Sequence, residues 1–165
     1  MPERKPTRLK EYDYSEQGAY FVTICTKDRE NLFSTIVVGQ GIAPAENRLT
    51  VFGEIAEEQI KALEMRYSSI KIDKYCIMPN HIHILISNYK ETAGASPCPT
   101  ISDVVCAFKS LTTRMCKNNG FVGKTLFQAS FHDHIIRGEH DYQHIWEYIN
   151  SNHLKWEKDD YYKKN

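Results

Sequence analysis

The sequence predicts a single α+β domain built on an antiparallel sheet, with helices packed against one face of that sheet. At 165 residues, with 41% hydrophobic and 25% charged residues, the chain has the size and composition of one globular domain. Strand-type and helix-type patterns follow one another in the order strand, helix, strand, strand, helix, strand, helix. Two βαβ-type halves followed by a terminal helix predict a ferredoxin-like sheet.

The first half of the chain supplies one strand, one long loop and one helix. Residues 19–26, AYFVTICT, are rich in β-branched and aromatic side chains and predict a buried strand. Residues 27–48 contain two glycines and a proline, so we predict that most of them form a loop. Residues 49–67 place apolar side chains at helical spacing, which predicts a helix.

Two strands joined by a tight turn are predicted in the middle of the chain. Residues 70–78, IKIDKYCIM, alternate as a strand, and residues 81–87, HIHILIS, form another. Only Pro79 and Asn80 separate them, and a connection this short favours an antiparallel hairpin. The following residues contain Gly, Ser and prolines and predict a second loop.

The second half repeats the pattern and adds a terminal helix. Residues 100–120 predict a helix with Thr100 or Ser102 as its capping residue. Residues 126–138 are predicted to form a strand that a glycine closes. Residues 139–156 predict a helix whose first turn carries the acidic residues that a helix dipole favours.

The distribution of charged residues predicts a basic arm before the domain and a charged tail after it. The formal net charge is zero, which counts against a generally basic nucleic-acid-binding surface but leaves local patches open. We assign residues 1–18 to the arm, 19–156 to one domain and 157–165 to the tail. The arm carries Arg4, Lys5 and Arg8, which can follow a phosphate backbone, although many such termini are only frayed and solvated.

Cysteine usage predicts a cytoplasmic protein. The five cysteines are odd in number and form no C-x-x-C pair, so they indicate reduced thiols rather than a disulfide framework or a zinc cage. The sequence has no signal segment and no unbroken apolar run of about 18 residues. We therefore expect neither export nor a membrane span.

The H-x-H pattern of His81 and His83 is a candidate metal site. Side chains alternate along a strand, so both imidazoles project from the same face. Two nitrogens could then bind one side of an ion and leave the other side open to substrate oxygens. Taken alone, such a pair is more often solvent-facing or hydrogen-bonded.

A second pair lies in the last predicted helix. Tyr148 and Asn152 are four residues apart and share one helix face. Asn152 offers an amide oxygen as a third metal ligand, and Tyr148 brings a phenol close to it. Each residue alone has a plainer interpretation, Tyr148 as a core aromatic and Asn152 as a helix cap.

Four blocks of sequence, in the family's order, closely resemble the REP-associated tyrosine transposases, relatives of the single-tyrosine HUH transposases of bacterial insertion sequences. The blocks are GAYFVTICTKDR, YCIMPNHIHILI, AFKSLTTRM and SFHDHIIRGEHDYQHIWEYINSNHLKW. The resemblance runs from about Arg8 to Trp156. One departure is His153, where the family usually has proline after the motif asparagine. Proline would stop the helix, and histidine lets it run on toward Trp156.

The resemblance implies an HUH nuclease fold that uses Mg²⁺ or Mn²⁺. It matches His81 and His83 to the two HUH histidines, and Tyr148 and Asn152 to the nucleophile and asparagine of a Tyr-x-x-x-Asn motif. It further implies nicking and strand transfer of single-stranded DNA beside palindromic hairpins, through a 5′-phosphotyrosine link. Two imidazoles and one amide oxygen fit Mn²⁺ better than Mg²⁺, which prefers an all-oxygen shell.

Other questions stay open at the level of sequence. Lys109 and Arg114 are plausible phosphate contacts. His132 and His134 repeat the H-x-H pattern, and hydrogen bonding within the sheet is the plainer explanation. The protein could be a monomer or a homodimer. Two rival functions are a catalytically silent hairpin-DNA-binding protein and a metal hydrolase of small phosphate esters.

Overall fold

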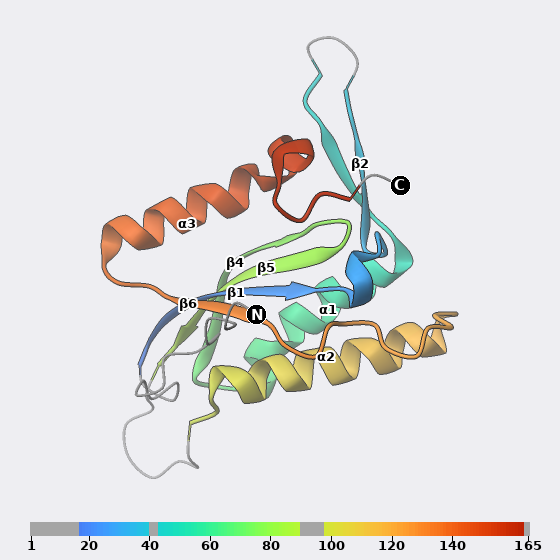
Figure 1. Ribbon diagram of the computed structural model, residues 1–165. Helices are drawn as coiled ribbons and strands as arrows, with labels where there is room; N and C mark the ends of the chain where they lie inside the picture. The colour runs from blue at the N-terminus through green and yellow to red at the C-terminus, as the bar shows by residue number, and fades with distance from the viewer. Residues whose placement is uncertain (1–16, 40–42, 90–97, 164–165) are drawn as a thin grey trace, which may run out of the picture.

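The computed structural model describes residues 17–39, 43–89 and 98–163, and its framework is a four-stranded antiparallel sheet (Figure 1). The strands, in the order β4-β5-β1-β6, are β4 (Ile70–Ile77), β5 (His81–Asn88), β1 (Gly18–Cys25) and β6 (His132–Ile135). Helices α1 (Val51–Arg66) and α2 (Ile101–Asn118) lie against one face, and α3 (Glu139–Ser151) lies over the other (Figure 1). This arrangement confirms the predicted ferredoxin-like α+β fold.

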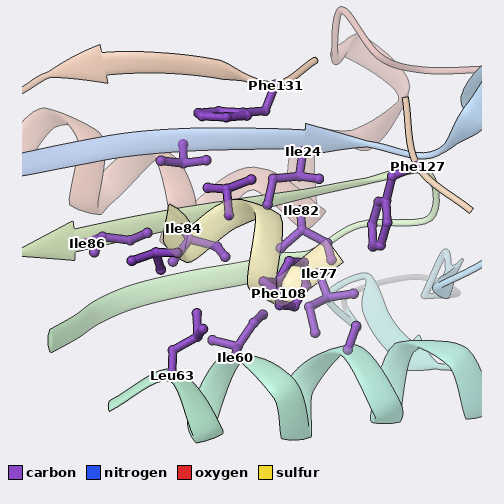
Figure 2. Close-up of a cluster of buried hydrophobic side chains, with 14 of the residues drawn as sticks. Ile24, Ile60, Leu63, Ile77, Ile82, Ile84, Ile86, Phe108, Phe127 and Phe131 are labelled. Carbon is purple, nitrogen blue, oxygen red and sulfur yellow. The ribbon is translucent and has the colours of Figure 1, made fainter. Parts of the chain in front are cut away.

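Alternation along the two central strands separates a core face from a site face. Ile24 of β1, with Ile82 and Ile84 of β5, is buried between the sheet and helices α1 and α2 (Figure 2). Val22 of β1 belongs to the same buried cluster. The intervening residues of both strands therefore face α3. Because the register pairs Thr23 with His83 and Cys25 with His81, these polar side chains meet on that second face.

The predicted hairpin and the helix starts are confirmed. β4 and β5 pair in an antiparallel ladder across the Pro79–Asn80 turn. The helix α2 begins with a capping box, in which the Thr100 hydroxyl accepts a hydrogen bond from the backbone N–H of Asp103 and the Asp103 carboxylate accepts one from the Thr100 backbone. None of the helices among the described residues is long and apolar enough to span a membrane.

Two predictions of local structure were wrong, one for a loop and one for a strand. The segment expected to be mostly loop contains a second antiparallel hairpin, formed by β2 (Ser34–Val37) and β3 (Glu46–Leu49), because the glycines and the proline gather between the strands. The strand expected over residues 126–138 is reduced to β6. Leu126 and Phe127 instead pack into the core as irregular chain.

The last helix also ends earlier than expected. After Ser151 the backbone tightens into the 3₁₀ helix η2 (Asn152–Lys158), with Lys155 outside helical geometry. The expectation that His153 would let the α-helix run on was therefore wrong. Asn152 and Trp156, at the start and in the middle of η2, are both buried.

Candidate metal and nucleophile site

The histidine pair is buried at the start of β5. The His81 and His83 side chains are 0% and 1% exposed, and their Nε2 atoms lie 3.0 Å apart. Two ligand atoms at about 2.1 Å from one octahedral ion stand about 3 Å apart, so this separation suits a shared metal. The pair is thus arranged as the sequence predicted.

Neighbouring hydrogen bonds fix which nitrogen of His81 is free. The Asn80 amide N–H₂ donates to the carbonyl oxygens of Tyr161 and Arg29, so its Oδ1 must face His81 Nδ1, at 2.9 Å. Nδ1 then carries the ring proton and donates it. Burial lowers the pKa of His81 to about 3, with help from nearby Arg29. The ring is therefore neutral, and its Nε2 offers a lone pair.

His83 is held by the neighbouring central strand. Its Nδ1 lies 2.8 Å from the Thr23 hydroxyl, which can either donate or accept a hydrogen bond. Burial lowers the pKa of His83 well below its ordinary value, and the adjacent His81 adds to this shift. When Thr23 accepts, His83 Nε2 is free to bind a metal beside His81 Nε2.

The helix α3 brings Tyr148 to this pair. Its hydroxyl lies 3.5 Å from His83 Nε2, and its ring makes an edge contact with Phe21 at 6.0 Å between centroids. The side chain is 37% exposed, so a substrate can reach it. Burial raises the pKa of Tyr148, nearby Asp159 raises it further, and a hydrogen bond with Asn152 lowers it. The phenol is therefore protonated at neutral pH.

Asn152 presents an unsatisfied oxygen to the same point. Its amide nitrogen donates to Asp159 Oδ2 at 3.0 Å, which fixes the orientation of the amide. Its Oδ1 is buried and finds no hydrogen-bond partner among the described residues. Asn152 also opposes the lowering of the His81 pKa, because this oxygen would accept a hydrogen bond from a protonated ring. This buried oxygen, which has no hydrogen-bond partner among the described residues, is available to bind a cation.

Sequence reasoning missed Asp159 and Tyr161, which it assigned to the charged tail. The Asp159 side chain is only 2% exposed, and its Oδ2 lies 3.8 Å from His81 Nε2. The ring of Tyr161 lies 4.5 Å from the ring of His81, and its backbone N–H donates to Asp159 Oδ1. Asp and Tyr in a polar C-terminal stretch give no signal of burial, so no local pattern could have found them.

The residues present fit a divalent cation. The ligand atoms of His81, His83 and Asp159 all lie within 4.8 Å of one another. Both imidazoles are neutral, so within the described part of the chain no histidine charge balances the buried Asp159 carboxylate. A bound cation would supply that charge and would also satisfy Asn152 Oδ1.

Of the remaining predicted contacts, the two on α2 lie away from the histidine pair. Arg4, Lys5 and Arg8 fall outside the described residues. Arg114 is exposed on α2, across the sheet from the histidine pair. The Lys109 ammonium, also on α2, donates to the carbonyl oxygens of Gln128 and Ala129, which anchors the segment before β6.

His132 and His134 stand on the edge strand and not at the metal site. They pair with Thr23 and Phe21 and so project from the same face as His83. His134 Nε2 lies 2.9 Å from Asp141 Oδ2 in the first turn of α3. The contact between His134 and Asp141 therefore links the edge strand of the sheet to the helix that carries Tyr148.

Comparison with known proteins agrees with this geometry. The sequence profile of the IS200-like transposases matches residues 15–152. The chain belongs to the IS200-like transposase family. An uncharacterized protein of Haemophilus influenzae is 32% identical over 174 residues, which cover 96% of this chain and 93% of that protein.

A solved structure shares the fold of this transposase-family chain. It is a REP-associated tyrosine transposase bound to a REP hairpin, and it superposes with a TM-score of 0.62. The two are 20% identical over 90% of this chain and 74% of the other. The profile match confirms the transposase resemblance inferred from the sequence, and the superposition confirms the fold.

Proposed function

We propose that this protein nicks single-stranded DNA beside palindromic hairpins and transfers the cut strand through a 5′-phosphotyrosine intermediate on Tyr148. One observation carries the proposal: the Tyr148 hydroxyl lies 3.5 Å from Nε2 of His83, beside the paired imidazoles. Membership of a transposase family supports DNA as the substrate, and the hairpin bound by the solved relative supports a hairpin.

His81, His83 and Asn152 would hold a divalent metal, Mg²⁺ or Mn²⁺, and Asp159 would join them. Three observations support these four ligands: the spacing of the two Nε2 atoms, the Asn152 oxygen without a hydrogen-bond partner, and the buried Asp159 carboxylate. When bound, the ion supplies positive charge that draws electron density from a phosphate oxygen and favours the phenolate. Two nitrogen ligands in this set favour Mn²⁺ over Mg²⁺.

The chain's own contribution is to position the nucleophile. Phe21 packs against both the Tyr148 ring and the His83 ring, which restricts the phenol to the histidine side of α3. The Tyr148 oxygen would form a bond to phosphorus while the bond to the 3′ oxygen breaks. The phenol loses its proton, and the departing strand leaves as a 3′-hydroxyl. Because the new phosphotyrosine bond is again a phosphodiester, another 3′-hydroxyl can reverse the step without ATP.

A single chain carries every residue that this step needs. Tyr148 reaches His83 of its own chain, so we propose an active site formed within one subunit, whether the protein is a monomer or a homodimer. Arg4, Lys5, Arg8 and Arg114 stay proposed phosphate contacts. Lys109 is proposed to act only by supporting the backbone segment to which it donates hydrogen bonds.

The test is formation of a covalent adduct. Labelled single-stranded hairpin DNA incubated with Mn²⁺ should yield a protein–DNA species that survives denaturant. Tyr148→Phe should abolish it, whereas Tyr142→Phe, on the same helix, should leave it unchanged. Hairpin binding without any adduct would instead identify a catalytically silent DNA-binding protein. Mixing Tyr148→Phe with His81→Ala should restore no adduct if the site lies within one chain.

A further inference from the structure

A groove lies beside the histidine pair, between the β2–β3 hairpin and the segment from η2 to the described end of the chain. Two cavities of about 310 and 350 Å³ make up this C-terminal groove, and both are lined by Ile36, Trp156 and Tyr162. Each is within the size range of ligand-binding pockets, which begins at about 300 Å³. The proposed chemistry at Tyr148 does not use it.

The lining combines aromatic and aliphatic surface. Trp156 is 8% exposed and borders both cavities, and the ring of Tyr162 meets it edge-on at 5.3 Å between centroids. Tyr162 itself is 37% exposed, so one face of an aromatic ring remains accessible. Val38 and Leu154, both exposed, extend the apolar wall. Exposed aromatic rings in a groove are the surfaces on which unpaired bases stack.

The rim of the groove is positively charged. Lys155 and Lys158 line the first cavity and Lys163 lines the second, against one acidic residue, Glu157. The Lys163 side chain donates a hydrogen bond to the Asp28 carbonyl oxygen. An aromatic floor with lysines along its edge matches the base and phosphate of a nucleotide, and it does not match a basic or purely apolar ligand.

The groove also adjoins the reacting centre. The ring of Trp156 lies 6.0 Å from the ring of His81 between centroids, so one side chain separates the groove from the metal ligands. We propose that the C-terminal groove binds unpaired nucleotides that flank the scissile phosphate, with one base stacked on Tyr162. This inference rests on the proposed function, because it takes single-stranded DNA as the substrate.

Binding without cleavage tests the groove. In EDTA, the dissociation constant is measured by fluorescence anisotropy for a bare hairpin and for the same hairpin with single-stranded extensions on both ends. Tyr162→Ala should weaken binding of the extended hairpin by about 5- to 150-fold, the range for loss of one stacked base. Binding of the bare hairpin should not change. Tyr162→Phe should bind like the wild type, and Tyr142→Ala, an aromatic outside the groove, is the matched control.

Tryptophan fluorescence gives an independent measurement. The chain has two tryptophans, so Trp146→Phe leaves Trp156 as the only reporter. The extended hairpin should quench its emission and the bare hairpin should not. Equal quenching by both DNAs, or equal loss of both affinities in Tyr162→Ala, would overturn the inference. Since neither measurement requires an adduct, the groove can fail while Tyr148 still reacts, and the reverse also holds.

Discussion

Asp159→Asn should separate metal binding from folding. The wild-type carboxylate is buried, accepts hydrogen bonds from Asn152 and Tyr161, and lies 3.8 Å from a neutral His81. Asparagine has nearly the same shape but loses the charge and one of these two hydrogen bonds. Without metal, loss of a hydrogen bond worth about 1 kcal/mol opposes relief of an unbalanced buried charge. The free energy of unfolding should therefore change by no more than about 1 kcal/mol.

With metal, the two proteins should differ clearly. At a Mn²⁺ concentration 100 times the wild-type Kd, binding stabilises the fold by about 2.7 kcal/mol. Loss of a group that holds the ion weakens metal affinity by about 10- to 100-fold or more. At the larger value the same Mn²⁺ concentration stabilises the variant by only about 0.4 kcal/mol. For a chain of this size the wild-type Tm should rise by about 5–11 °C, and the variant Tm by about 1–2 °C.

The assay is thermal unfolding followed by circular dichroism, in EDTA and in Mn²⁺. Asp160→Asn is the matched control, because its carboxylate is exposed and next in sequence. It should show the full wild-type rise in Tm. If Asp159→Asn also kept the full rise while His81→Ala lost it, the ion would bind without Asp159, and our assignment of this carboxylate would be refuted.

Three other perturbations address the histidines, the core and the helix anchor. In metal-free buffer the free energy of unfolding should fall as the pH drops below about 6.5, by up to about 1.4 kcal/mol per pH unit for each of His81 and His83. The unfolded chain then binds protons that these buried rings, with lowered pKa values, exclude, and urea unfolding between pH 7 and 5 measures the slope. A flat profile would contradict neutral rings. Ile84→Ala should cost about 2–5 kcal/mol in the same urea assay, because it leaves a cavity under the sheet; a loss below 1 kcal/mol would mean that the core closes around it. His134→Ala should cost at most about 1 kcal/mol of stability but slow adduct formation, since it removes the side-chain contact from β6 to Asp141 and leaves only the hydrogen bond from the Arg137 backbone; unchanged adduct kinetics would count against this anchor.

Much of the fold was predictable because local patterns carry it. The β-branched and aromatic residues of β1 indicate a strand, the H-x-H spacing in β5 places both histidines on one face, and the apolar residues of α1 recur at helical spacing, so these element types followed directly. The β2–β3 hairpin was missed because its short, half-exposed strands lack an apolar stripe. The predicted strand over residues 126–138 was too long, because Leu126 and Phe127 are buried without entering the ladder.

The sequence by itself determined which side chains share a face. Successive side chains of a strand point to opposite faces, and a helix repeats about every 3.6 residues. His81 therefore shares a face with His83, and Tyr148 shares a face with Asn152, whatever surrounds them. Only the tertiary structure decided that α3 docks on the histidine face, and that η2 then returns Asp159 and Tyr161 to the same point. Those contacts join residues 65 or more positions apart. They depend on packing free energy across the whole domain, which no local pattern encodes.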